Sequence, residues 1–189
     1  MVRIKQVREH YLLVAILMIA VIVRILAAFY LGDEVSALPG IHDQISYNAL
    51  AQSLLAGKGF SFNQNWYPFT PAHAQTAHWS FIYPIFLTSI YKITGNHPLA
   101  ARLVQGIIGG VLISLLLYLI GRRLFDRSVG LIAAAIGAIY AYYIYYNVAL
   151  MTETFFIITM LLSIYICLQI KEKSTLIRWI ALGLSLIHI

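Results

Sequence analysis

The feature that most constrains this chain is a series of long apolar segments with almost no charge. They cover residues 11–31, 99–120, 129–150 and 152–170, and a further apolar stretch covers 176–189. A helix needs about 20 apolar residues to cross the hydrocarbon core of a bilayer. We therefore expect an all-α membrane protein, a polytopic bundle of transmembrane helices. Because 176–189 is shorter than a span, we also expect the chain to be the N-terminal part of a longer protein.

The composition supports lipid as the main solvent of this chain. Of its 189 residues, 61% are hydrophobic and only 11% are charged. A soluble domain is usually about 45–50% apolar and about 25% charged. The net charge of +6 does not indicate a nucleic-acid partner, because the basic residues stand at the ends of the apolar segments.

Three basic clusters predict the orientation in the membrane. They are Arg3, Lys5 and Arg8; Arg122, Arg123 and Arg127; and Lys171, Lys173 and Arg178. Cytoplasmic loops of membrane proteins carry an excess of Lys and Arg. We expect a multi-pass protein of the plasma (inner) membrane, with a cytoplasmic N-terminus and an extracytoplasmic loop over 32–98. The first apolar segment is long enough to span, and no convincing cleavage site follows it, so we expect an uncleaved helix rather than a signal peptide.

The predicted external loop contains two short helices of its own. Tyr47, Leu50, Ala51, Leu54 and Leu55 recur at helical spacing, and glycines at 57 and 59 end that helix. The apolar segment 81–93 is too short to span, so we interpret it as an amphipathic interfacial helix with a proline in its first turn. An aromatic-rich stretch connects the two helices.

Two acids are candidate catalytic groups. Asp43 directly precedes the first loop helix, where it is either an N-cap that accepts backbone hydrogen bonds or a general base at the membrane surface. Glu153 stands one residue into the fourth apolar segment. An acid there either faces a polar cavity or benefits from the helix dipole at an N-terminus.

Two arginines are candidate phosphate ligands. Arg24 lies within the first apolar segment, and Arg102 opens the second. An Arg guanidinium binds phosphate well. The alternative for each is a structural anchor, and Arg24 can also extend its side chain toward the outer surface.

A divalent metal ion is left open as a cofactor. His42 and His78 are weak candidate ligands within the external loop, which also contains His73 and His97. None of these pairs has the His-x-x-x-His spacing of a helical metal site.

Five sequence pieces, in this order, resemble membrane glycosyltransferases of the GT-C fold. They are VIVRILAAFYLGDE, HDQISYNALAQSLLAGKGFSF, HWSFIYPIFLTSIYKITGNHPLAARLVQ, YLIGRRLFDRSVGLIAAAI and MTETFF. The chain resembles the N-terminal third of the protein mannosyltransferase and aminoarabinose transferase superfamily. The aminoarabinose branch has a lysine-proline-proline run where HWSFIYP stands here. The chain is therefore closer to the bacterial enzymes that act on lipopolysaccharide sugars or proteins.

The resemblance implies an activity and assigns roles to the candidate residues. It implies inverting transfer of a sugar from a polyprenyl-phosphate donor, a membrane lipid, to a lipid, glycan or protein acceptor on the outer face. By likeness Asp43 is the base that deprotonates the acceptor, and Glu153 is a second acid in the same cavity. Arg24 and Arg102 would bind the donor phosphate.

A transporter or flippase is the alternative from another functional class. Such proteins are built from inverted repeats and have helices that are broken near the membrane midplane. The sequence shows neither feature, and the large external loop favours the enzyme.

Overall fold

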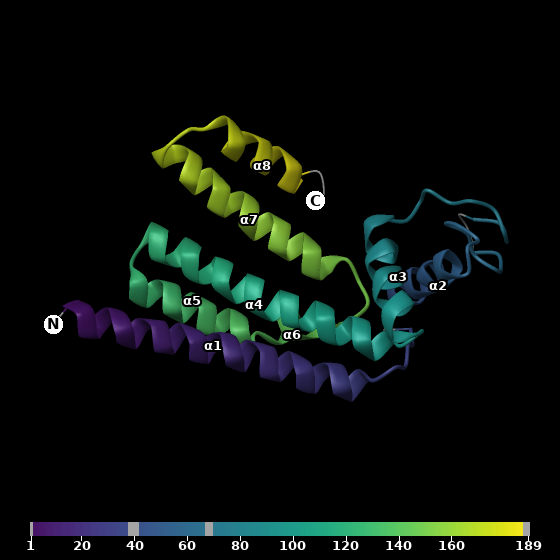
Figure 1. Cartoon of the computed structure of the whole chain (residues 1–189), viewed down its shortest axis with the longest axis horizontal. Helices are drawn as coiled ribbons and strands as arrows, with labels where there is room; N and C mark the ends of the chain where they lie inside the picture. The colour runs from purple at the N-terminus through teal and green to yellow at the C-terminus, as the bar shows by residue number, and fades with distance from the viewer. Residues whose placement is uncertain (1, 38–41, 67–69, 187–189) are drawn as a thin grey trace. The chain divides into compact units, whose positions relative to one another are not determined.

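The computed structural model describes residues 2–37, 42–66 and 70–186 (Figure 1). These residues form eight α-helices and no β-strand, which confirms an all-α membrane protein. The helices are α1 (Val2–Leu31), α2 (Asp43–Leu55), α3 (Ile82–Thr94), α4 (Pro98–Leu124), α5 (Arg127–Ile139), α6 (Ala141–Val148), α7 (Glu153–Glu172) and α8 (Leu176–Leu186).

The chain divides into two compact units. The helical unit consists of Met1–Ala27, Gln105–Val148 and Glu153–Ile189, and the loop unit consists of Ala28–Val104 and Ala149–Thr152. The helical unit contains α5 to α8, most of α4 and all but the last turn of α1. The loop unit contains α2, α3 and the segment between them.

Three described helices are long and apolar enough to cross a membrane: Glu9–Leu31, Pro98–Leu124 and Glu153–Glu172. Large apolar side chains stand exposed along them, such as Leu26 and Phe29 on α1, with 63% and 60% of their surface accessible. Such exposure suits contact with lipid. These helices begin and end within a few residues of three of the predicted spans.

The predicted span 129–150 is not one straight helix. It is divided into α5 and α6, which are bent by 54° at the break. Tyr140 stands between them with extended backbone angles, φ −65° and ψ 117°. The apolar pattern of this segment is continuous across the break, so hydropathy alone did not predict it.

Small residues let the spans of the helical unit approach closely. A Cβ atom added to Gly121 of α4 would lie 3.0 Å from the Cα atom of Gly130 in α5. Ala134, Gly137 and Ala138 of α5 are also buried. This agrees with the small-residue packing typical of membrane helices. On another side of α4, Ile113 and Leu116 pack with Ile158 and Leu161 of α7.

In the loop unit, α2 packs on α3. Leu50 and Ala51 of α2 are fully buried, as are Leu87 and Tyr91 of α3. The Tyr91 hydroxyl donates a 2.7 Å hydrogen bond to the Asn48 side chain. Burial raises the pKa of the Tyr91 phenol, while the charge of Arg102 lowers it and that of Asp33 raises it. The phenol therefore keeps its proton and remains a donor to α2.

The segment between α2 and α3 is folded in its described part. Isolated bridges pair Ser61 with Gln75 and Trp66 with Thr70. The rings of Phe62 and Trp66 stack with their centroids 4.5 Å apart. A long loop with its own backbone pairing and aromatic core is typical of a functional insertion rather than a flexible connection.

The orientation of these elements across the membrane is testable by cysteine labelling. Gln64 in the loop unit and Ser128 at the start of α5 are both exposed. Each is changed to Cys in a Cys167→Ala background, since Cys167 is the only cysteine. The charge clusters predict that a membrane-impermeant maleimide labels position 64 in intact cells, and position 128 only after permeabilisation. Labelling of position 128 but not 64 in intact cells would reverse the topology.

Candidate functional site

Arg24 is buried completely inside the helical unit and is held there by four hydrogen bonds. Its Nε donates to the Asn147 side chain at 2.7 Å, and Nη1 donates to the carbonyls of Ala20 and Ala138 at 2.9 Å each. Nη2 donates to the Gly137 carbonyl at 3.3 Å. A guanidinium has five N–H groups, so four of the five are used.

The position of Arg24 explains the break between α5 and α6. The last four carbonyls of a helix lack partners within the helix, and in lipid no water replaces them. Gly137 and Ala138 lie in the last turn of α5, and Arg24 satisfies both carbonyls. Its positive charge also suits the negative end of the helix dipole. Arg24 therefore serves as a C-terminal cap for α5 within the membrane.

A buried polar network extends from Arg24 to the start of α7. Asn147 Nδ2 donates to the Thr154 hydroxyl at 3.2 Å, and Gln105 Nε2 donates to the same oxygen at 3.0 Å. The Thr154 hydroxyl donates to the Tyr146 carbonyl at 3.0 Å. Thr154 directly follows Glu153, so this network fixes the backbone next to the candidate acid.

Glycines on α4 make room for this network. A Cβ atom on Gly109 would lie 2.6 Å from Cγ of Asn147, and one on Gly110 would lie 2.9 Å from Cδ of Arg24. Neither position has room for a side chain without displacing a buried, hydrogen-bonded partner.

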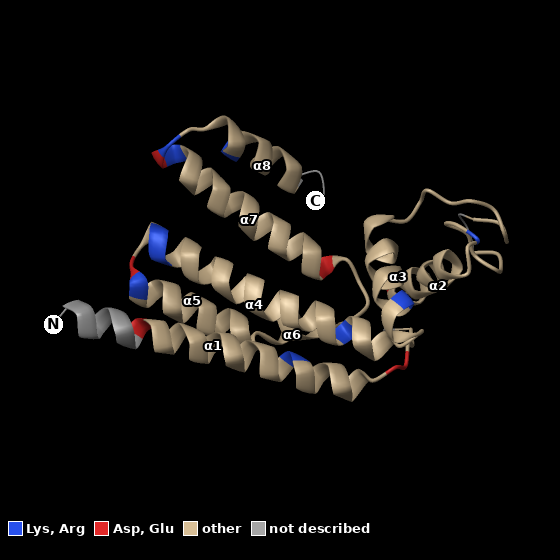
Figure 2. Cartoon of the chain, viewed as in Figure 1, with Lys and Arg blue, Asp and Glu red and all other residues tan. Residues whose placement is uncertain are grey.

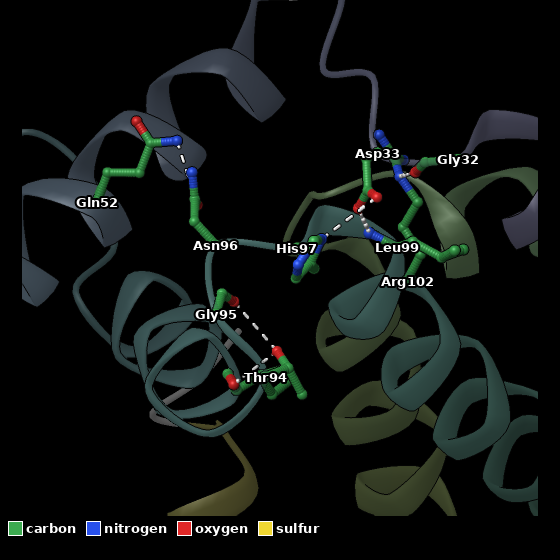
Figure 3. Close-up of polar contacts among 10 residues, drawn as sticks. Gly32, Asp33, Gln52, Thr94, Gly95, Asn96, His97, Leu99 and Arg102 are labelled. Carbon is green, nitrogen blue, oxygen red and sulfur yellow. Dashed lines mark hydrogen bonds and ion pairs between the residues drawn. The ribbon is translucent and has the colours of Figure 1, made fainter.

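Arg102 has a comparable place in the loop unit. It is 1% exposed, and its guanidinium donates to the carbonyls of Gly32 at 3.1 Å and Glu34 at 2.7 Å. Both carbonyls come just after the end of α1, where Gly32 has a left-handed φ of +58°. Asp33 lies between them and accepts a 2.8 Å hydrogen bond from the Leu99 amide at the start of α4 (Figure 3). Together these contacts tie the end of α1 to the beginning of α4.

Asp43 is the first residue of α2, and the preceding His42 occupies the N-cap position without a side-chain cap bond. The Asp43 side chain is half-buried. Within the part of the chain that the structure describes, it forms no hydrogen bond or ion pair. The structure thus gives no support to the N-cap interpretation of Asp43. A carboxylate in the first turn still gains from the helix dipole.

Glu153 is the first residue of α7 and is half-buried, with its Oε2 atom shielded from solvent. Each of the two candidate acids is therefore the first residue of its own helix, at the positive end of the helix dipole. Glu153 lies in the helical unit and Asp43 in the loop unit.

The four candidate residues divide between the units in two pairs. Arg24 is linked to the start of α7 through Asn147 and Thr154. In the loop unit, no ion pair joins Asp43 to Arg102 among the described residues. Phosphate binding by the two arginines stays a prediction, since their observed partners are protein carbonyls and an amide.

The histidines give no metal centre in the described part of the chain. No three His, Cys, Asp or Glu side chains gather there in a way that could hold a metal ion. The His42 side chain is exposed, and the His78 ring packs edge-on against Trp79 with 5.4 Å between centroids. Their role as ligands stays a prediction.

Sequence reasoning missed Asn147, Thr154 and Gln105. The sequence does contain a signal for Asn147 and Gln105, because a side-chain amide inside an apolar segment is costly in lipid and therefore has a partner there. Asn147 bonds Arg24 directly, whereas Gln105 is linked to it only through Thr154 and Asn147.

A family model described as dolichyl-phosphate-mannose-protein mannosyltransferase matches residues 78–186, which are 109 of the 189 residues. The match includes Arg102 and Glu153, whereas Arg24 and Asp43 precede it. No curated protein and no solved structure gives a significant match.

The tight packing around Arg24 predicts a large effect from one added methyl group. Gly109→Ala would push Asn147 away from Arg24 and overpack the site, which typically costs about 1–3 kcal/mol. We expect a lower Tm for this variant of the intact protein in detergent. Gly183→Ala on α8 is the matched control, because a Cβ there meets no atom within 4 Å. Equal Tm values for both variants would contradict the proposed importance of this packing.

Proposed function

The chain belongs to the dolichyl-phosphate-mannose-protein mannosyltransferase family and is thus a membrane glycosyltransferase of the GT-C type; we propose that it moves a sugar from a polyprenyl-phosphate donor, with inversion, to a lipid, glycan or protein acceptor on the outer face. Asp43 deprotonates the acceptor hydroxyl in this proposal. The hydroxyl oxygen attacks the anomeric carbon of the sugar, and the bond from that carbon to the phosphate oxygen breaks. The polyprenyl phosphate then leaves with the bonding electrons.

The observation that carries this proposal is the environment of Asp43. A general base needs a carboxylate that can reach the hydroxyl and is not already committed to another group. Asp43 is half-buried on a folded loop unit, and it has no hydrogen-bond or ion-pair partner within the described residues. An acid that served only as a cap would show a bond to the backbone of its own helix, and this acid shows none.

Glu153 is the second acid of the proposal. The bonds among Asn147, Gln105 and Thr154 hold the first turn of α7 in one conformation. An acid whose backbone is fixed in this way keeps a constant position, and fixed position is a large part of what an enzyme contributes to catalysis. In this proposal Glu153 would orient the sugar or its acceptor.

Arg24 and Arg102 could bind the donor phosphate only if they first released their present hydrogen bonds. Arg24 has one N–H group beyond its four observed bonds, and Arg102 is already bonded to two carbonyls. They bind the donor phosphate only in a conformation that releases these bonds. In the conformation described here they hold helix ends.

The break between α5 and α6 is a feature typical of transporters, and the proposed enzyme does not require it. In transporters the carbonyls freed at such a break coordinate ions. Here the carbonyls of Gly137 and Ala138 both accept hydrogen bonds from Arg24. These carbonyl groups already have a partner within the protein. The break is therefore better explained by helix packing than by ion coordination in a transporter.

Asp43→Asn tests the catalytic assignment in the intact protein. Asn keeps the size of the side chain but cannot accept a proton as a carboxylate does. We expect normal expression and donor binding, with turnover lower by about 10²–10⁴-fold, as is typical when a general base is lost. Transfer of labelled sugar from the polyprenyl-phosphate donor measures turnover.

Asp126→Asn is the matched control for this substitution. Asp126 is the N-cap of α5 and accepts a 2.9 Å hydrogen bond from the Val129 amide. Asn caps a helix about as well as Asp, so this variant keeps its activity. A well-expressed Asp43→Asn protein with turnover near that of the control would remove Asp43 as the base and leave Glu153 as the next candidate.

A further inference from the structure

Basic residues gather at one end of the helical unit, where α4 and α7 end and α5 begins (Figure 2). Arg122 and Arg123 stand in the last turn of α4, and Lys171 stands in the last turn of α7. Cations near a helix C-terminus are usual, because they balance the negative end of the dipole. Arg122 and Arg123, however, also line a cavity, and a cation that only balances a helix dipole does not require a cavity.

The cavity lies between the ends of α4 and α7 and has a volume of about 380 Å³. Its lining residues are Leu119, Arg122, Arg123, Tyr165 and Glu172. Ligand pockets usually fall between about 300 and 1,000 Å³. The cavity is therefore large enough for a small polar head group.

Arg123 is held in place at the wall of this cavity. Its guanidinium carbon lies 5.8 Å from the centroid of the Tyr165 ring, and its Nη2 pairs with the Glu172 carboxylate. Its Nε is buried and has no hydrogen-bond partner among the described residues. A buried N–H donor without an acceptor is energetically costly. A ligand oxygen that accepted a hydrogen bond from this N–H group would therefore be stabilising.

Arg122 is also pre-positioned, through contacts that reach α1. Its guanidinium carbon lies 5.9 Å from the centroid of the Tyr118 ring, and its Nη1 donates to the Tyr118 hydroxyl at 3.3 Å. That hydroxyl donates to Glu9 at 2.7 Å. Among the described residues, Arg122 has no other partner, so most of its N–H groups remain available to a ligand.

The polar and apolar parts of the lining are arranged as in a lipid molecule. The two arginines and Glu172 lie at the helix ends, whereas Leu119 lies one turn deeper on α4 and Tyr165 two turns deeper on α7. Two guanidinium groups against one carboxylate leave a net positive charge. A ligand that fits this pattern has an anionic head and an apolar tail.

We propose that this cavity binds the phosphate of an anionic phospholipid in the adjacent leaflet. Arg122 and Arg123 contact the phosphate oxygens, and an acyl chain runs along Leu119 and Tyr165. Basic pockets between transmembrane helices are known to suit such head groups, and the Arg fork matches phosphate geometry. A free phosphate ion has the same charge chemistry but gains nothing from the apolar wall.

The test measures binding of phosphatidylglycerol to the intact protein. The purified protein is placed in phosphatidylcholine nanodiscs or detergent, phosphatidylglycerol is titrated in, and bound lipid is counted by native mass spectrometry. Arg122→Gln/Arg123→Gln should weaken binding by about tenfold or more, since charge-assisted hydrogen bonds are lost. Lys171→Gln/Lys173→Gln removes the same charge from exposed positions that do not line the cavity, and it should change binding little.

Two further measurements distinguish lipid binding in the cavity from attraction to general surface charge and from binding of free phosphate. Leu119→Trp fills the cavity without changing charge, so it should also weaken phosphatidylglycerol binding, even if the double arginine variant does not fold. Equal losses in the arginine and lysine double variants, or unchanged binding in Leu119→Trp, would overturn the proposal. Inorganic phosphate that competes with phosphatidylglycerol at equal concentration would show that the site takes phosphate alone, and this would overturn the lipid assignment.

Discussion

The structure depends above all on how a broken helix satisfies its carbonyl groups where no water is present. The break at Tyr140 frees carbonyls in the last turn of α5, and in lipid each one would cost several kcal/mol if it stayed without a partner. Arg24 supplies N–H donors to Gly137 and Ala138, and Asn147 from α6 fixes the guanidinium from the other side of the break. The contact thus pins α5, α6 and α1 together. Gly109 and Gly110 let α4 pack against this contact.

The same physical device recurs in the loop unit with Arg102. It donates to carbonyls just beyond the end of α1, while Asp33 accepts from the first turn of α4. Cations therefore stand at the negative ends of helices, and the candidate acids Asp43 and Glu153 stand at positive ends. The first effect of this pattern is to balance the dipoles at the helix ends. A role in chemistry must be argued from what remains uncommitted after that, and among these residues Asp43 is the clearest case.

Much of the fold was predictable because hydropathy and helical spacing report directly on burial in lipid and on amphipathic packing. The spans at α1, α4 and α7 follow from apolar length, and α2 follows from Tyr47, Leu50, Ala51, Leu54 and Leu55, with Gly57 after its end. The break within 129–150 was not predictable. It depends on a partner more than 110 residues away in sequence, Arg24, and no local pattern around Tyr140 encodes that partner.

The candidate site shows the corresponding limit for charged residues. An arginine within a span is a functional candidate by default, because an unpaired charge in lipid is costly. That reasoning assumes that the partner is a ligand, yet backbone carbonyls at a helix end are equally good partners and are invisible in a sequence. The amides of Asn147 and Gln105 were the available clue, since polar residues in neighbouring apolar segments tend to bond to one another. A charge accompanied by such amides is more consistent with a structural network, whereas Asp43 has no hydrogen-bond or ion-pair partner among the described residues and stays the proposed base.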